Sequence, residues 1–127
     1  MPGKLVSRMS KRECYTLKQS DTIKIASQEL SEKKIGCMPV IDDKKNVVGI
    51  FTDGDLRRTL KKSPNISNIL LKTVMTKKFI KVTDDILAAE ALTIMEKNEI
   101  TSLIVVDRKK SLSGLLTLNL LLKKGIE

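Results

Sequence analysis

The stretch that decides the fold is Gly49-Ile50-Phe51-Thr52-Asp53-Gly54-Asp55-Leu56-Arg57-Arg58. An apolar strand ends here at Phe51, and a helix is predicted to begin after Thr52, whose hydroxyl suits an N-cap. A carboxylate at Asp55 and two guanidinium groups, at Arg57 and Arg58, follow within the next two turns. This order fits two interpretations. One is a capped helix with negative charge in its first turn, and the other is an acceptor for a diol beside groups that bind phosphate.

The chain contains the same pattern twice. An offset of 65 residues aligns residues of matching type across strand, helix, strand, strand and helix without a gap. The aligned pairs include Leu17 and Val82, Ala26 and Ala91, Val40 and Val105, Asp42 and Asp107, Gly49 and Gly114, and Thr52 and Thr117. Matching aliphatic residues alone could arise by chance, but the Asp, Gly and Thr pairs in one register indicate an internal duplication.

The first copy is expected to contain a strand over 14–18, an amphipathic helix, a hairpin of strands over 37–41 and 47–51, and a short final helix. Ser20 or Asp21 offers an N-cap for the first helix, and Gly36 is expected to end it. Leu56 and Leu60 are expected on one face of the final helix.

The second copy is expected to repeat this order, with a strand over 79–82, a helix capped by Thr83 or Asp84, a hairpin of strands over 101–106 and 112–116, and a last helix that Thr117 opens. We divide the chain into a lead-in segment over 1–12, a first repeat over 13–62, a connector over 63–72 and a second repeat over 73–127.

The composition allows one domain, or two small units that share an aliphatic core. The chain has 127 residues, of which 41% are apolar and 2% aromatic. The net charge of +9, from 24 Lys and Arg against 15 Asp and Glu, favours anionic partners such as phosphates, nucleotides or nucleic acid. His is absent, which removes the commonest general base and the commonest metal ligand. We therefore expect no metal site.

Cysteine usage and hydropathy predict a cytoplasmic protein. Cys14 and Cys37 are widely spaced and form no C-x-x-C motif, so we expect two reduced thiols, with Cys37 in the core. No apolar run approaches the ~18 residues of a membrane span, and the N-terminus lacks the apolar segment of a signal peptide. These features favour a soluble protein without membrane contact.

The duplicated β-α-β-β-α unit, with an apolar strand leading into G-x-x-T-x-x-D, resembles the cystathionine-β-synthase (CBS) domain. Two such units in tandem resemble a CBS pair, or Bateman module. The resemblance implies an α+β fold in which the two repeats pack with pseudo-twofold symmetry. It also implies clefts between the repeats, which bind adenosine or other nucleotide derivatives in many members.

Further motifs are similar to the C-terminal CBS pair of bacterial arabinose-5-phosphate isomerases of the sugar isomerase (SIS)-CBS family. They are the stretch over 49–58, Val74-Met75-Thr76, Ala89-Glu90-Ala91-Leu92 and Ile100-Thr101-Ser102. In that family an N-terminal isomerase domain, missing here, interconverts ribulose 5-phosphate and arabinose 5-phosphate on the route to Kdo in lipopolysaccharide or capsule. The resemblance implies that this chain is a regulatory fragment and not an enzyme by itself.

The first copy carries the candidate ligand site. The Asp55 carboxylate can accept hydrogen bonds from both hydroxyls of a ribose. Thr52 and the free amides at the helix start suit a phosphate, and Arg57 or Arg58 adds charge-assisted hydrogen bonds.

Residues outside this stretch complete the candidate site. Met38 and Pro39, on the neighbouring strand, are expected to form an apolar wall for a base. Pro39 cannot donate to a strand ladder, so we expect it at a strand start, an edge or a break. Lys77 and Lys78 precede the next strand and are candidates to reach a phosphate.

The second copy is expected to bind more weakly. Thr117 aligns with Thr52, but a leucine, Leu120, stands where Asp55 does, and a leucine cannot hold a diol. We therefore expect one stronger nucleotide site instead of two equal ones.

Three functions remain open from the sequence. The first is a regulatory module that senses AMP, ADP, ATP or CMP-Kdo, requires no cofactor, forms a homodimer and acts on an isomerase domain. The second is a structural dimerisation module without a ligand. The third is nucleic-acid binding, which the net charge suggests but which one Tyr, two Phe and no Trp make a poor fit, because little is available for base stacking.

Overall fold

The computed structural model describes residues 15–63, 65 and 68–123. Packing divides the chain into two compact units. The first unit comprises residues 15–79, and the described part of the second unit comprises residues 80–123. The predicted lead-in over 1–12 and Cys14 lie outside the described residues.

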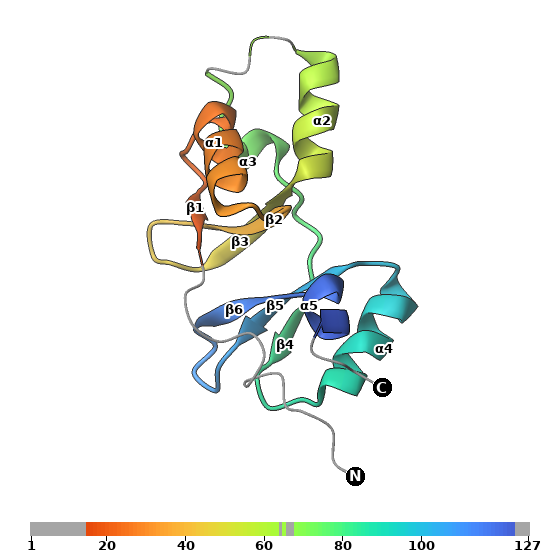
Figure 1. The fold of residues 1–127 in the computed structure, drawn as a ribbon. Coiled ribbons are helices and arrows are strands. Elements are labelled where there is room, and N and C mark those ends of the chain that lie inside the picture. The colour runs from red at the N-terminus through yellow and green to blue at the C-terminus, as the bar shows by residue number, and fades with distance from the viewer. Residues whose placement is uncertain (1–14, 64, 66–67, 124–127) are drawn as a thin grey trace. The chain divides into compact units, whose positions relative to one another are not determined.

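The first unit is a three-stranded sheet with helices (Figure 1). Its elements are β1 (Leu17–Lys18), α1 (Ile23–Lys33), β2 (Cys37–Ile41), β3 (Val47–Thr52), α2 (Asp53–Lys62) and α3 (Leu71–Val74). The strand order is β1-β2-β3. The strands β1 and β2 are parallel because α1 connects them as a crossover, whereas β2 and β3 form the predicted antiparallel hairpin.

The second unit repeats this arrangement. Its elements are β4 (Lys81–Thr83), α4 (Ala88–Asn98), β5 (Ser102–Val106), β6 (Leu112–Thr117) and α5 (Leu118–Lys123). The strand order is β4-β5-β6, with a parallel and then an antiparallel pair. The α+β fold class and the duplicated element order are therefore confirmed.

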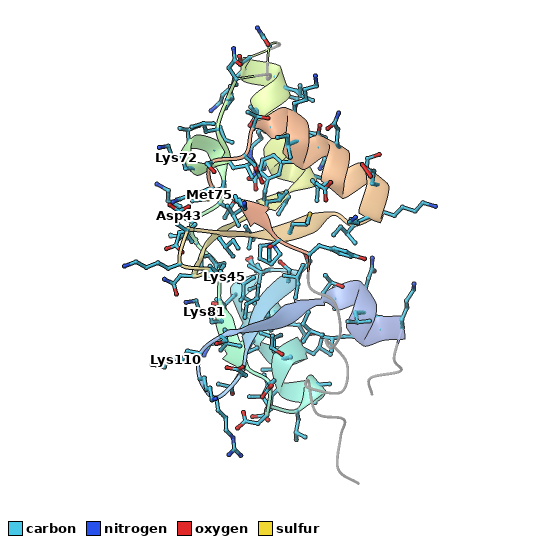
Figure 2. The ribbon with its side chains drawn as sticks, turned by 90° about the vertical axis from the view of Figure 1, so that its left-hand side faces the viewer. Asp43, Lys45, Lys72, Met75, Lys81 and Lys110 are labelled. Carbon is cyan, nitrogen blue, oxygen red and sulfur yellow. The ribbon has the colours of Figure 1, made fainter. Side chains whose placement is uncertain are left out.

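The duplication extends to details of the backbone. Among the described residues, the non-glycine residues with positive φ form two pairs at the 65-residue offset. Lys34 (56°) corresponds to Glu99 (55°), and Lys45 (67°) corresponds to Lys110 (65°). Lys45 and Lys110 lie in the turns between the hairpin strands, and both are labelled in Figure 2. The two hairpins also share a register irregularity, between Val40 and Ile41 in the first and at the aligned place in the second.

Each unit has its own aliphatic core on one face of its sheet. In the first unit α1 buries one side against alternate residues of β2 and β3, which are Ile23, Ala26, Leu30, Met38, Val40 and Phe51. The residues at the same offset form the second core and are Ala88, Ala91, Met95, Leu103, Val105 and Leu116. The helical and strand periodicities of the sequence therefore selected the buried faces correctly.

The helix boundaries differ from those expected. The N-cap of α1 is Thr22, whose hydroxyl oxygen accepts a hydrogen bond from the Ile25 N–H at 3.3 Å. The predictions of Ser20 or Asp21 were wrong because the Asp21 carboxylate instead accepts from the Lys18 N–H. The helix ends at Lys34, before Gly36, because Lys34 takes the left-handed conformation and donates its N–H to the last turn.

The start of α4 was also predicted at the wrong residue. The N-cap is Leu87, not Thr83 or Asp84, and the Glu90 carboxylate accepts a hydrogen bond from the Leu87 N–H at 2.9 Å. This carboxylate satisfies one of the unpaired amides that a helix start exposes, and no capping hydroxyl is needed.

Pro39 explains why β1 is shorter than β4. In the second unit the Ile104 N–H donates to the Ile80 carbonyl at 2.9 Å, and Lys81 pairs with Ile104. Pro39 aligns with Ile104 but has no N–H, so the parallel pairing begins one residue later, at Leu17 and Val40. Pro39 lies in the middle of the continuous central strand β2, so the expectation of a strand start, an edge or a break was wrong, and only the hydrogen bond that its missing N–H would donate is lost.

The buried face of α2 is polar. Asp55 and Thr59 are its buried residues. Leu56 and Leu60 lie four positions apart in this helix and share one face, as expected. Leu56 is partly buried against the first core, whereas Leu60 is 43% exposed, so the helix turns a carboxylate inward.

The segment after α2 belongs by packing to the first unit. Leu71 is fully buried in the first core, and the backbones of Ile50 and Thr76 exchange two hydrogen bonds of 2.9 Å. Residues 71–79 therefore pack with the first unit, although the sequence division assigns residues 73–79 to the second repeat. The predicted repeat boundaries stay a prediction, since compact packing and sequence repetition divide this segment differently.

Candidate functional site

The junction between β3 and α2 is a capping box, in which Thr52 and Asp55 each accept a hydrogen bond from the backbone of the other. Thr52 is the N-cap residue, and its hydroxyl oxygen accepts a hydrogen bond from the Asp55 N–H at 3.0 Å. In return, Asp55 Oδ2 accepts from the Thr52 N–H at 3.0 Å. The predicted capping role of Thr52 is confirmed, and each partner satisfies an amide that the helix start would leave unpaired.

The Asp55 carboxylate also holds the segment that follows α3. It is 4% exposed, and its Oδ1 accepts hydrogen bonds from the Thr76 hydroxyl at 2.8 Å and from the Arg58 guanidinium. A carboxylate has about four acceptor positions, and three are used here. Asp55 therefore contributes to the structure whether or not a ligand is present.

The two arginines have different surroundings. The Arg58 side chain is 66% exposed while it pairs with the buried Asp55 carboxylate, so solvent or a ligand can reach the guanidinium. Arg57 is exposed, and within the described residues the structure records no hydrogen bond or ion pair from it. Arg58 is therefore the arginine that the fold brings to Asp55.

Met38 and Pro39 point to opposite faces of the sheet, because side chains alternate along a strand. Met38 is fully buried among the first core residues. Pro39 pairs with Ile50, whereas Cys37 pairs with Thr52, so Pro39 shares the sheet face of Thr52. Met38 therefore belongs to the core and its predicted place on an apolar wall was wrong, whereas Pro39 is buried on the sheet face of Thr52 and its role toward a base stays a prediction.

Lys77 and Lys78 are exposed and follow Thr76 directly. The backbone pairing of Thr76 with Ile50 brings the start of this basic pair to the edge of β3. The structure records no contact between either ammonium group and Asp55. Their predicted role toward a phosphate therefore stays a prediction.

Sequence reasoning missed Thr76 as a partner of the site. Its hydroxyl lies 21 positions from Asp55 in the sequence, so no local spacing connects them. The duplication gave no signal either, because Leu120 occupies the aligned acidic position in the second copy. Only the packing of residues 71–79 on β3 brings Thr76 to the carboxylate.

The second copy keeps the cap and loses the carboxylate. The Thr117 hydroxyl oxygen accepts a hydrogen bond from the Leu120 N–H at 3.1 Å, as Thr52 does from Asp55. Leu120 packs against the second core and offers no acceptor. The two copies therefore share a helix cap but not a group that could hold a diol.

The described residues contain no helix that is long and apolar enough to cross a membrane. Within the same residues, no group of three or more His, Cys, Asp or Glu side chains is arranged to hold a metal ion.

Comparisons with known proteins agree on one family. The sequence profile of the CBS domain matches residues 6–62 and again residues 71–127. The arabinose 5-phosphate isomerase KdsD of Pseudomonas aeruginosa is 42% identical over 101 residues, which cover 80% of this chain and 31% of that protein. This chain spans about a third of the length of the curated relatives that it matches.

Solved structures have the same fold. The CBS domain pair of protein MJ0100, in complex with 5′-methylthioadenosine and S-adenosyl-L-methionine, has a TM-score of 0.86 at 23% identity over 97% of this chain and 96% of that chain. CBSX2, in complex with AMP, has a TM-score of 0.80 at 25% identity over 98% and 97% of the two chains.

Proposed function

Because this chain belongs to the CBS domain family, as a tandem pair of repeats, we propose that it is a regulatory module that binds a nucleotide or nucleotide-sugar at Thr52 and Asp55. The observation that carries the proposal is the Asp55 carboxylate, which is buried at a helix start and paired with an exposed Arg58. Such a carboxylate can exchange a mobile cationic partner for the hydroxyls of a ribose.

The exchange has a simple chemistry. A ribose diol that donates to Asp55 Oδ1 takes the acceptor position of Arg58, and the released guanidinium is then free for a charge-assisted bond to the phosphate. Pro39 lies on the same sheet face as Thr52, and the exposed Lys77 and Lys78 add positive charge. Thr117 supplies a comparable cap in the second copy, but we expect weaker binding there because Leu120 accepts nothing.

The curated relatives support a place for this module in sugar-phosphate metabolism. They are named arabinose 5-phosphate isomerases, and this chain covers only about a third of them. We propose that it modulates an N-terminal domain that interconverts D-arabinose 5-phosphate and D-ribulose 5-phosphate in the cytoplasm, and that this chain alone has no catalytic activity. The candidate ligands are AMP, ADP, ATP and CMP-Kdo.

Calorimetric titration of the chain with these four ligands tests the site. Asp55→Asn should weaken binding at least about tenfold, because it removes the charge that the ligand hydroxyls meet. Asp43→Asn is the control, since Asp43 is an exposed carboxylate in the turn between β2 and β3 and lies in neither candidate site, and it should leave the affinity unchanged. No binding to the wild type, or equal affinity in Asp55→Asn, would show that the site is assigned wrongly.

Arg58→Ala separates two roles of the arginine. If Arg58 only competes with the ligand for Asp55, the affinity rises, whereas it falls if the guanidinium binds the ligand phosphate. An affinity equal to that of the wild type excludes both roles. Thermal unfolding of each variant shows whether the cap has remained folded.

A structural dimerisation module is the second candidate function. The observation that favours it is that Asp55 already accepts hydrogen bonds from Thr52, Arg58 and Thr76, so the carboxylate needs no ligand. Sedimentation velocity distinguishes the two functions. A homodimer whose dissociation constant is the same with and without the four nucleotides supports the structural role, and a dimer whose stability changes with ligand supports the sensing role.

A further inference from the structure

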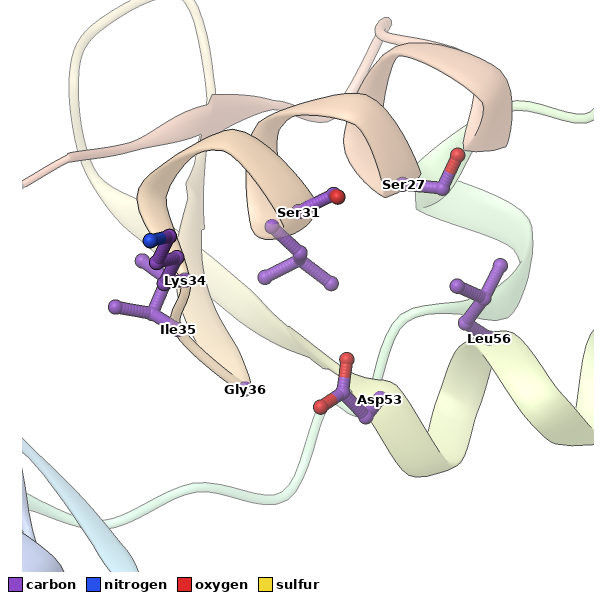
Figure 3. Close-up of a pocket in the computed structure, with 8 residues that line it drawn as sticks. Ser27, Ser31, Lys34, Ile35, Gly36, Asp53 and Leu56 are labelled. Atoms are coloured by element: carbon purple, nitrogen blue, oxygen red, sulfur yellow. The ribbon is translucent and has the colours of Figure 1, made fainter.

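A pocket in the first unit lies between α1 and the start of α2 (Figure 3). Its volume is about 370 Å³, and its lining combines an apolar floor with polar side chains at the rim. The floor residues are Leu30, Ile35 and Leu56, and the rim residues are Ser27, Ser31, Lys34, Gly36 and Asp53. A pocket of this size is at the low end of the range for small-molecule sites.

The pocket lies on a different face of α2 from the Asp55 site. Asp53 and Leu56 are three residues apart and share one helix face, whereas Asp55 and Thr59 share the buried face. A ligand in the pocket therefore does not need the Asp55 carboxylate. The pocket and the nucleotide site can be tested separately.

The duplication explains why this space is open in the first copy. Three rim positions carry larger or more apolar residues at the 65-residue offset, since Ser27, Gly36 and Asp53 align with Leu92, Thr101 and Leu118. Leu92 and Leu118 pack against the second core. In the second copy, larger and more apolar side chains occupy these positions. In the first copy, small or polar residues stand there and leave the space between the two helices open.

The rim carries charges without internal partners. Among the described residues, the structure records no ion pair for Lys34 and no hydrogen bond to the Asp53 carboxylate, which points into the pocket in Figure 3. Asp53 is held in place because its N–H donates to the Gly36 carbonyl at 2.9 Å. Ser27 donates its hydroxyl to the Lys24 carbonyl at 2.9 Å, so its oxygen can still accept.

We propose that this pocket binds a small hydroxylated anion, of the sugar-phosphate or sugar-acid class. Hydroxyl groups of the ligand donate to Asp53, its anionic group meets the Lys34 ammonium, and the C–H surface of its carbon chain lies on Leu30 and Leu56. The Asp53 carboxylate favours a ligand with several hydroxyl donors, and the Lys34 ammonium favours a ligand that carries an anionic group. The size of the pocket favours a ligand smaller than a nucleotide.

Amide chemical-shift mapping by NMR with D-ribose 5-phosphate and D-gluconate tests the proposal. The amides of Ser31, Lys34, Gly36 and Asp53 should shift and saturate with one of the two ligands, and which one responds identifies the anionic group. D-ribose and inorganic phosphate alone are the controls. Each should produce at least about tenfold weaker binding, because each lacks one of the two charge-assisted contacts.

Matched variants use the second copy as the reference. Ser27→Leu introduces the residue of the second copy and should abolish the shifts, whereas Leu92→Ser makes the reverse change in the other unit and should leave them intact. Lys34→Gln leaves the pocket open and should weaken binding about tenfold or more, so the proposal remains testable if Ser27→Leu fails to fold.

Three results would overturn the proposal. One is the absence of saturable shifts up to about 10 mM ligand. Another is equal binding of inorganic phosphate and D-ribose 5-phosphate, which would mean a surface anion contact only. The third is a shift pattern centred on Thr52, Asp55 and Thr76, which would assign the ligand to the nucleotide site.

Discussion

Replacing Gly49 by alanine should detach the segment after α3 from the first sheet. A Cβ at Gly49 would lie 2.7 Å from Met75 Sδ and 2.9 Å from the Thr76 carbonyl oxygen. The Met75 side chain can rotate away, but the backbone oxygen can move only if the segment moves. Gly49 is therefore required by the close approach of residues 75–76 to β3.

The size of the effect follows from the contacts at risk. Thr76 exchanges two backbone hydrogen bonds of 2.9 Å with Ile50, each worth about 1 kcal/mol, and donates its hydroxyl to Asp55. Overpacking a tight site costs about 1–3 kcal/mol. We expect Gly49→Ala to lower the free energy of unfolding by about 2–3 kcal/mol.

Urea unfolding measures this change, from the shift in the midpoint urea concentration when the dependence of the free energy of unfolding on urea is the same in both proteins. Hydrogen exchange at the Ile50 and Thr76 amides should accelerate in the same variant. Gly36→Ala is the matched control, because its Cβ would meet only the exposed Asp53 carboxylate, at 3.1 Å, and should cost less than about 0.5 kcal/mol. A Gly49→Ala chain as stable as this control, with unchanged exchange at Thr76, would refute the argument from close approach.

Three further predictions concern single residues. Glu99→Gly should stabilise the second unit by about 0.5–1 kcal/mol in thermal unfolding, since Glu99 has a left-handed backbone that glycine adopts without strain. As a control, Glu96→Gly inside the helix should destabilise this unit by about 1 kcal/mol. Phe51→Ala should cost about 3–5 kcal/mol in urea unfolding, because Phe51 is fully buried in the first core. The hydrogen bond from the Asn46 backbone lowers the pKa of Asp42 below 3.8, so the carboxylate stabilises the hairpin above that pH, and this contribution is lost as the pH falls through the lowered pKa. A ¹³C titration of the carboxyl group checks it, and a pKa at or above 3.8 would contradict it.

Much of the fold could be predicted because its signals are periodic. The apolar positions of α1 and the run over 37–41 gave the buried helix face and the buried strand, and the repeat at 65 residues extended both to the second unit. The missing N–H of Pro39 accounts for the shorter parallel pairing of β1, but its position inside the continuous β2 was not expected. The periodic features depend on local geometry, which the spacing of residues along the sequence indicates directly.

Other features depend on contacts between distant segments. Lys34 and Glu99 end their helices in a left-handed conformation for which lysine and glutamate carry no sequence signal, whereas glycine is the residue that usually ends a helix in this way. The sequence therefore favours Gly36 over Lys34 as the end of α1. The exposure of Leu60 could not be foreseen, because the buried residues of α2 are Asp55 and Thr59. The Thr76 partner of Asp55 lies 21 positions away in the sequence, beyond any local motif. The cap at Thr52 was predictable from spacing, but the full set of partners was not.

The hydrogen bond from Thr76 to Asp55 has a consequence for affinity. The ligand replaces Arg58 at Oδ1, whereas Thr76 keeps its hydrogen bond to the same oxygen, so the molecules ready to bind are the fraction in which Thr76 holds the carboxylate in place. The apparent dissociation constant is the intrinsic constant divided by that fraction. Any change that loosens residues 75–76 therefore weakens binding without touching the ligand.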